Sequence, residues 1–264
     1  MTRLIREFFS AINSALPKSL TFRTGGQVWK IPYVSRSMDR LMRPGRESET
    51  GEWVKRFLPN ADVIIDIGAN VGQSLIQYRS LYPDAEYIGF EPNPVSSSVI
   101  VRLIAMNGLK RCKVFTVGVG PEFRTLELLI DANRLDDPTA TVVADCHPEA
   151  ASRIALPIVI SPIQHLVPDL KLSTNTLIKI DVEGYEVDVL ESLGDLVDHR
   201  PTIVSEVLTE WRDAPEAREL YVQRMHAWLD GHNYSIVAIG QGEVDRINDK
   251  FGMYLFVPSE LRSN

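Results

Sequence analysis

Hydrophobic residues in this 264-residue chain fall into short continuous runs that alternate with segments of helical periodicity. Strands without polar alternation, separated by helices, indicate a parallel sheet covered on both faces. The pattern predicts strands at residues 63–67, 87–90, 113–117, 176–180 and 202–206, and helices at residues 49–58, 72–81, 95–107, 185–193 and 214–229. Two closing strands, 234–239 and 253–257, are joined by a polar loop with glycines, which favours an antiparallel hairpin.

Two segments lie outside this alternation. Residues 1–46 are predicted to form an N-terminal extension that serves as a lid or as an oligomer or substrate contact, and residues 47–264 form the main domain. Residues 119–175 carry short strand-like pieces (125–130, 139–144 and 156–160) and few helix signals, so we expect an excursion over the sheet edge or the mouth of the site. Apolar residues of the extension recur at helical spacing and predict a helix on the body or on a second copy of the chain: Leu4, Phe8, Ile12 and Leu16.

Composition places the chain among ordinary globular proteins, with 44% hydrophobic and 24% charged residues. Cys112 and Cys146 match no zinc-ligand or CxxC spacing, and we interpret them as reduced thiols of a cytoplasmic protein. The absence of an apolar run of ~18 residues predicts no stable membrane insertion. Transient binding of the N-terminal helix to a membrane surface remains an alternative.

Charge is divided unevenly along the chain. Residues 1–46 hold nine basic and two acidic residues, a local net charge of +7, so the remainder carries −14 to reach the total of −7. An acidic body argues against a nucleic-acid-binding protein, whose footprint is normally basic. The basic front segment either meets an anionic substrate or docks on the acidic body of the protein.

Acidic residues follow four of the five central strands. In open α/β sheets, ligands bind beyond the carboxyl ends of the strands. The residues found there, in chain order, are Asp66, Glu91, Gly118, Asp181 and Glu206. Their alignment at one edge predicts a binding or catalytic site.

The spacing after the first of these strands is Asp66-x-Gly68-x-x-x-Gly72, which differs from the G-x-G-x-x-G of dinucleotide-binding folds. A carboxylate beside the turn disfavours a pyrophosphate and favours a cofactor with cationic groups, such as S-adenosylmethionine. Glu91 can accept hydrogen bonds from ribose hydroxyls, which fits NAD and S-adenosylmethionine alike. An NAD(P)-binding oxidoreductase, and a helix-capping turn without a ligand, therefore stay open as alternatives.

Three motifs, "DIGANVG", "FEPNP" and "LIKIDVEGYEVDVL", together resemble the FkbM family of S-adenosylmethionine-dependent methyltransferases. The resemblance runs from about Asp62 to Glu206. It implies an α/β class I methyltransferase (Rossmann-like) fold with a mostly parallel seven-stranded sheet, whose last strand is antiparallel, plus the N-terminal helical/β extension. It also implies methyl transfer to a hydroxyl group of a sugar or a natural product such as a polyketide.

The resemblance assigns roles by position. The residues that would surround the methionine part of the cofactor are Asp66, Gly68, Asn70 and Gly72. Glu91 would hold the ribose, with Asn93 beside the adenosine, while the backbone at Gly118, or Glu122 beyond it, would hold the adenine. Asp181 and Glu183 would lie at the transfer site.

Methyl transfer to an alcohol requires removal of the hydroxyl proton, for which the candidates are Asp181, Glu183, Glu206 and His165. Asp181 and Glu206 end neighbouring strands and could instead hold Mg²⁺, although no third protein ligand is evident. A binding protein with this fold and no turnover remains an alternative. The basic front segment hints at an anionic acceptor such as a nucleotide sugar.

Overall fold

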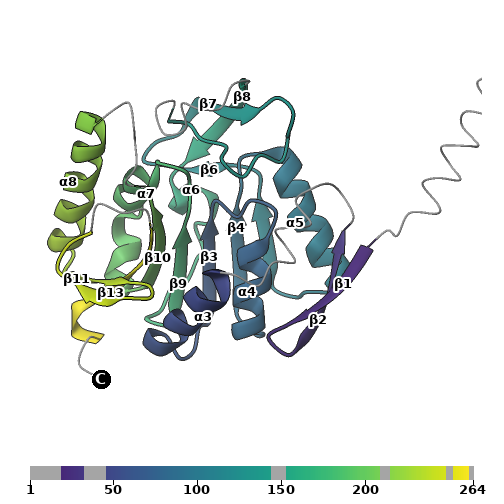
Figure 1. Cartoon of the computed structure of the whole chain (residues 1–264), viewed down its shortest axis with the longest axis horizontal. Helices are drawn as coiled ribbons and strands as arrows, with labels where there is room; N and C mark the ends of the chain where they lie inside the picture. Colours follow the sequence, from purple (N-terminus) through teal and green to yellow (C-terminus); the bar gives the residue numbers. More distant parts are fainter. Residues whose placement is uncertain (1–18, 33–45, 144–152, 209–214, 248–251, 262–264) are drawn as a thin grey trace, which may run out of the picture.

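The computed structural model describes residues 19–32, 46–143, 153–208, 215–247 and 252–261, and these form a central eight-stranded sheet with helices on both faces (Figure 1). The five central strands are parallel, and β13 is antiparallel to both of its neighbours. From edge to edge the strands are β12 (Gly242–Val244), β11 (Tyr234–Ala238), β13 (Gly252–Pro258), β10 (Thr202–Val207), β9 (Thr176–Ile180), β3 (Val63–Ile67), β4 (Glu86–Phe90) and β5 (Cys112–Phe115).

Each face of the sheet has its own apolar core, because successive side chains of a strand point to opposite faces. Ile64 of β3 belongs to the core beneath α3 (Arg46–Phe57), α4 (Gln73–Leu81) and α5 (Pro94–Asn107). Its neighbour Ile65 belongs to the opposite core, beneath α6 (Ile163–Leu166), α7 (Glu186–Ser192) and α8 (Pro215–Gly231). Two short 3-10 helices, η2 (Gly194–His199) and η3 (Ser259–Leu261), are the remaining helices of the described part of the chain. No described helix is long and apolar enough to cross a membrane.

Part of the N-terminal extension is a β-hairpin of β1 (Ser19–Thr24) and β2 (Gln27–Pro32). Trp29 is buried in the α3–α5 core, and its indole nitrogen donates to Ser80 Oγ at 3.1 Å. The Asn107 side chain pairs with the backbone of Lys30 at 2.7 Å through both its oxygen and its nitrogen, as a neighbouring strand would. The hairpin is therefore attached to the body near the end of α5. The predicted helix through Leu4 to Leu16 lies outside the described residues.

All seven predicted strands of the main sheet are present, and the antiparallel last strand is confirmed. The strands predicted at 63–67 and 176–180 have the observed ends, while the other strand and helix ends differ by a few residues. The sheet has one strand more than predicted. Residues 242–244 lie in the polar loop before β13 and pair with β11 as the short edge strand β12.

The excursion contains a second, three-stranded sheet in the order β6-β8-β7, formed by β6 (Gly118–Val119), β7 (Arg124–Asp131) and β8 (Arg153–Ser161). It lies beyond the carboxyl ends of the central strands, at the top of Figure 1. The strand predicted at 139–144 is wrong for its described part: residues 139–143 form only an isolated bridge between Thr141 and Leu129. The side chains of Asp137 and Thr141 hydrogen-bond backbone groups of this segment, which favours turns over a strand.

Candidate active site

The turn after β3 brings the ends of β3 and β9 into close contact. Gly68 has φ of +78°, and a Cβ at this position would lie 1.8 Å from the carbonyl oxygen of Asp181. Only glycine fits such an approach. The next residues continue the turn, and Asn70, with φ of +48°, donates its backbone N–H to Glu91 Oε2 at 2.8 Å. The turn thus links the ends of three neighbouring strands.

Asp66 is fully buried beneath this turn. Its Oδ2 accepts hydrogen bonds from Tyr87 Oη at 2.5 Å and from the Ser74 hydroxyl, while Oδ1 lies 3.4 Å from Lys179 Nζ. Asp66 is not among the residues that line the pocket at the strand ends. The expectation that Asp66 faces the cofactor does not match this arrangement, because the side chain is fully buried, Oδ2 is held by Tyr87 and Ser74, and Oδ1 has Lys179 as its ion-pair partner.

Lys179 is the site residue that the motif analysis missed. Its ammonium group is buried, donates to the carbonyl oxygen of Gly68 at 2.7 Å and lies 3.2 Å from Asp181 Oδ2. Burial alone would lower the pKa of Lys179, but the charges of Asp181 and Asp66 outweigh it and raise the pKa above its ordinary value. The sequence signal was a single charged residue within the apolar strand "LIKI".

Glu91 directly follows β4 and lines the pocket. Its carboxylate is held by two backbone amides, those of Asn70 and Asn93, each at 2.8 Å. Burial raises the pKa of Glu91 to about 7, although both hydrogen bonds act in the opposite direction. Asn93 itself does not line the pocket. Its side chain caps α5 by accepting from Val95 N at 3.0 Å and donates to Leu135 O at 2.8 Å.

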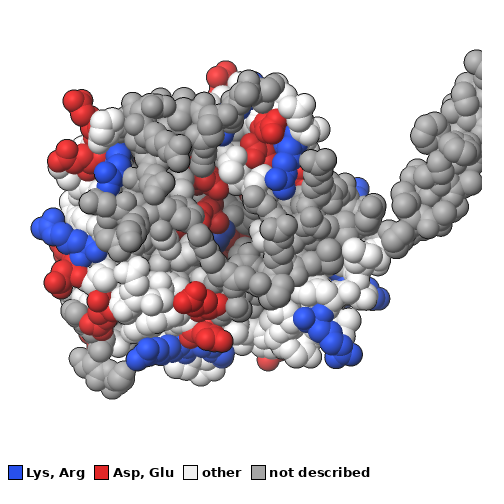
Figure 2. All heavy atoms as spheres, in the orientation of Figure 1, with Lys and Arg blue, Asp and Glu red and all other residues white. Residues whose placement is uncertain are grey.

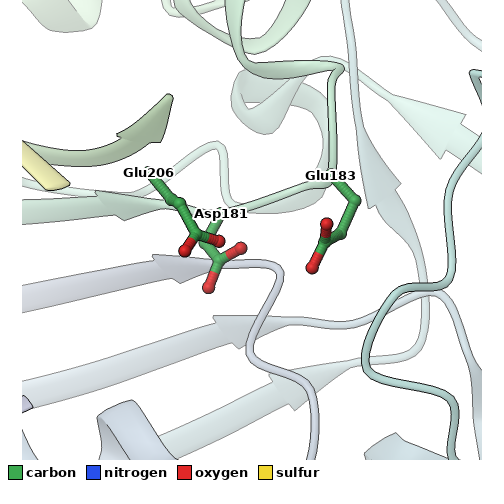
Figure 3. A group of neighbouring side chains, drawn as sticks. All are labelled: Asp181, Glu183 and Glu206. Carbon is green, nitrogen blue, oxygen red and sulfur yellow. The ribbon is translucent and has the colours of Figure 1, made fainter. Parts of the chain in front are cut away.

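Three carboxylates from two neighbouring strand ends lie together: Asp181 and Glu183, which line the pocket, and Glu206, which lies beside them but does not line it. One oxygen of each lies within 4.8 Å of the others, and Figure 3 shows Glu206 and Asp181 side by side with Glu183 pointing toward them. The sequence had suggested only the pair Asp181 and Glu206 as metal ligands. The structure adds Glu183 as a third carboxylate at this position.

Glu183 reaches this position because its backbone is left-handed, with φ of +53°. The loop that carries it is held by Glu186, whose Oε1 accepts from Val182 N at 3.1 Å and from Gly184 N at 3.0 Å. Tyr221 donates to the other oxygen at 2.7 Å. Glu186 is thus a fully buried anchor of the loop.

Burial raises the pKa of Glu206 to about 10, and the neighbouring Asp181 carboxylate adds to this effect. Two adjacent carboxyl groups share one proton because both cannot be ionised at low cost. Lys179 lies against Asp181, so the charged member of the pair is Asp181 and the protonated member is Glu206.

Residues 135–141 connect the region after β4 with the loop after β9. Leu135 at one end accepts from Asn93, and Thr141 at the other donates its hydroxyl to the carbonyl oxygen of Glu183 at 2.6 Å. The pocket beneath this segment is lined by Ile67, Gly68, Asn70, Phe90, Glu91, Pro92, Gly118, Val119, Leu128, Asp137, Pro138, Ala140, Val142, Ile158, Ile160, Asp181, Val182, Glu183 and Tyr185.

The remaining predicted residues are divided between the pocket and its surroundings. Gly118 lines the pocket, and a Cβ there would lie 2.7 Å from Ile160 Cγ2. Gly72 has φ of +93° at the N-cap of α4 and faces α5, so its role is in packing. His165 is exposed on α6 and Glu122 is exposed beside Arg124. Neither lines the pocket, so the structure does not bring them to the site.

Sheet order, glycine turn and strand-end acids together define the class of this protein, a methyltransferase with the class I, S-adenosylmethionine-dependent fold. The chain belongs to the methyltransferase FkbM domain family, whose model matches residues 66–236. The resemblance inferred from the three motifs is confirmed, and family membership removes the oxidoreductase alternative.

Two curated relatives and one solved structure show the extent of the similarity. Methyltransferase sdnD of Sordaria araneosa is 26% identical over 178 residues, which cover 58% of this chain and 68% of the relative. Methyltransferase 1 of Beauveria bassiana is 28% identical over 159 residues, 52% of this chain and 60%, less than two thirds, of the relative. A Klebsiella pneumoniae protein assigned as an O-methyltransferase has a TM-score of 0.50 at 12% identity, with 95% of this chain and 94% of that chain covered, and shows the fold alone.

Proposed function

We propose that this methyltransferase transfers a methyl group from S-adenosylmethionine to a hydroxyl oxygen of a small-molecule acceptor, a sugar or a natural product. The observation that carries the proposal is the position of Asp181. Through Lys179 it is joined to the cofactor turn at Gly68, and it lies beside Glu183 and Glu206 at the pocket. A carboxylate that can accept a proton, that of Asp181, thus lies between the turn at Gly68 and the carboxylates of Glu183 and Glu206.

The residues present fit this cofactor. Glu91 offers a buried carboxylate to ribose hydroxyls, and Gly68 and Asn70 line the pocket where the methionine part would lie. Gly118, Val119 and Pro92 offer backbone and apolar surface to an adenine ring. When bound, the cofactor supplies a methyl group on a cationic sulfur. Asp66 contributes indirectly, by holding Lys179 beneath the turn.

In this proposal Asp181 is the general base. A general base must lie within hydrogen-bond reach of the proton that it removes, and its charge must survive at the working pH. Lys179 forms an ion pair with Asp181, Glu206 supports Asp181 as a hydrogen-bonding acid, and Glu183 orients the acceptor hydroxyl. In-line displacement depends above all on placement, so these residues act mainly by fixing the acceptor oxygen.

A second arrangement of the same site uses Mg²⁺, and the specific observation in its favour is the third carboxylate, Glu183. Carboxylate oxygens are the ligands that Mg²⁺ prefers, and a bound divalent ion would lower the pKa of the acceptor hydroxyl. Turnover that survives exhaustive EDTA treatment would leave proton transfer to Asp181 as the mechanism. Turnover that is lost with EDTA and restored by Mg²⁺ would favour the metal.

The test of the proposed function is calorimetric binding of S-adenosylmethionine and S-adenosylhomocysteine, with NADH as the negative control, followed by transfer of a radiolabelled methyl group to hydroxyl-bearing acceptors. Binding without transfer to any acceptor would support the alternative of a silent binding protein. Cytoplasmic location and pairing with a second copy also remain proposals. Fractionation of cells and light scattering of the purified protein test them.

A further inference from the structure

We infer that the acceptor is an uncharged molecule with an apolar body, and that it is not a nucleotide-linked or phosphorylated sugar. The inference rests on the proposed function, since it names the acceptor class for the same site. It is carried by the chemistry of the pocket wall and by the positions of the charged groups around it.

One wall of the pocket is apolar and comes from the excursion. Leu128 of β7 and Ile158 and Ile160 of β8 belong to one buried cluster, against which Ala140 and Val142 pack. This cluster is separate from the two cores that hold the helices on the sheet. The small sheet therefore presents an apolar face to the pocket in addition to filling its own interior.

This apolar wall continues to the transfer acids and is not confined to the cofactor side. Thr141, between two wall residues, donates to the carbonyl oxygen of Glu183 at 2.6 Å. Tyr185 packs against the same cluster. A Cβ at Gly120 would lie 2.6 Å from Ile160 and 3.4 Å from the Tyr185 ring, so those two side chains flank the same point. An acceptor with its hydroxyl at Asp181 would rest its body on this wall.

The charged residues of the pocket lining are all acidic. Among the described lining residues there is no lysine, arginine or histidine, and four are acids: Glu91, Asp137, Asp181 and Glu183. Figure 2 shows acidic atoms at the wall of the hollow in the centre of this face. Phosphate groups are normally recognised by arginine or lysine side chains or by the free amides of a helix N-terminus.

Four donors in or beside the pocket already have partners within the protein. Lys179 is paired with Asp66 and Asp181, at 3.4 and 3.2 Å. Arg124, which touches the pocket through its hydrogen bond to Tyr185 Oη at 3.0 Å, is paired with Glu122 at 3.1 Å. The loop amides before α7, those of Val182 and Gly184, donate to Glu186.

The described part of the basic N-terminal segment does not bring positive charge to the pocket. Arg23 and Lys30 lie on the β1–β2 hairpin, which is bound to Asn107 at the last turn of α5. The first turn of α5 follows the strand-end residue Glu91, so the hairpin is attached at the opposite end of the helix from the pocket. Within residues 19–32, the positive charge is therefore remote from the acceptor.

The experiment measures acceptor-side binding on the protein saturated with S-adenosylhomocysteine, so that it does not depend on turnover. The probes are Nile red, a neutral apolar dye, followed by fluorescence, and uridine diphosphate glucose, followed by calorimetry. Ile158→Lys places a cation in the wall, while Val159→Lys places the same cation one residue away on the exposed outer face of β8. Ala140→Lys is a second wall variant at a partly exposed position, in case Ile158→Lys unfolds the protein.

We expect Nile red to bind the wild-type protein and Val159→Lys equally, and at least tenfold more weakly to the wall variants, with no heat from uridine diphosphate glucose. The inference is overturned if the sugar nucleotide binds and Nile red does not, or if wall and outer-face variants weaken Nile red equally. Methyl transfer to neutral alcohols with an apolar body is then measured separately. Binding of Nile red without methyl transfer to any acceptor would contradict the proposed function, while it would support an apolar acceptor pocket.

Discussion

The ammonium nitrogen of Lys179 lies 3.2 Å from Oδ2 of Asp181, and the carbonyl oxygen of Gly68 accepts a hydrogen bond from the same group. One buried cation therefore touches the turn after β3, the carboxylate of Asp181 and the carboxylate of Asp66. Removing the charge of Lys179 would leave the negative charges of Asp66 and Asp181 without a counter-ion.

Lys179→Met should destabilise the protein by about 3–5 kcal/mol, because it leaves the buried carboxylate of Asp66 without its counter-ion. The free energy of unfolding in urea measures this loss. Removing the charge of the other buried partner in the double variant Asp66→Asn/Lys179→Met should recover part of the stability. Methyl transfer should stay impaired in the double variant, because Asp181 still lacks its partner. A double variant no more stable than the single one would contradict the ion-pair role.

Asp181→Asn should lower kcat by about 10²–10⁴-fold, the usual contribution of a general base, with cofactor affinity changed only a few-fold. The matched control is Glu206→Gln, since a protonated carboxylic acid and an amide can both donate a hydrogen bond to Asp181. We expect Glu206→Gln to keep much more activity than Asp181→Asn. Equal losses in the two variants would instead favour the metal arrangement, in which both carboxylates are ligands.

Glu91→Gln should weaken binding of S-adenosylhomocysteine by about tenfold, in the range of a lost charged hydrogen bond. Because burial raises the pKa of Glu91 to about 7, wild-type affinity should increase as the pH rises from 6 to 8 and the carboxylate forms. Calorimetry at several pH values measures both effects. An unchanged pH dependence in Glu91→Gln would assign that dependence to another group.

Folding stability should fall between pH 5 and pH 8.5, in part through Glu186. Burial raises the pKa of Glu186 from 4.5 to about 7, so the folded protein holds this proton more tightly than the unfolded chain. The contribution is complete below about pH 4.5 and is lost as the pH rises through 7. Glu186→Gln should reduce the fall by up to ~3 kcal/mol, as measured by urea unfolding at both pH values.

Gly68→Ala should abolish cofactor binding and destabilise the fold by more than about 2 kcal/mol, because the added Cβ would lie 1.8 Å from the Asp181 carbonyl oxygen. Gly108→Ala is the matched control, since Gly108 is also left-handed, with φ of +60°, but a Cβ there meets nothing within 4 Å. The control should cost only about 1 kcal/mol. Thermal unfolding and calorimetry compare the two variants.

The central sheet could be predicted because its strands are uniform apolar runs between turn residues, as at Thr176–Ile180. The edge strand β12 could not, because its three residues, Gly242–Val244, have no apolar pattern and pair through the backbone alone. The strand expected through Thr141 has a suitable composition. Its side-chain hydrogen bonds to local and distant backbone groups override that propensity.

The candidate site was predictable in its location but not in its internal contacts. Strand ends identify Glu91, Asp181 and Glu206, whereas the face that a side chain adopts depends on its neighbours in the sheet. Asp66 stands opposite Lys179 in the register of β3 and β9, and this pairing of distant segments turns a presumed cofactor ligand into an internal counter-ion. No local pattern around either residue contains that information.

That pairing has a consequence for how the chain finds its fold. A shift of β9 by one residue along β3 would turn the Lys179 ammonium toward the opposite apolar core. It would also leave the Asp66 carboxylate buried without a counter-ion. A buried polar pair can in this way specify the register of a sheet, and here it joins β3, the middle one of the five parallel strands, to its neighbour β9. Lys179, which holds the Asp181 carboxylate in place, would thus also disfavour misaligned pairing of β3 and β9 during folding.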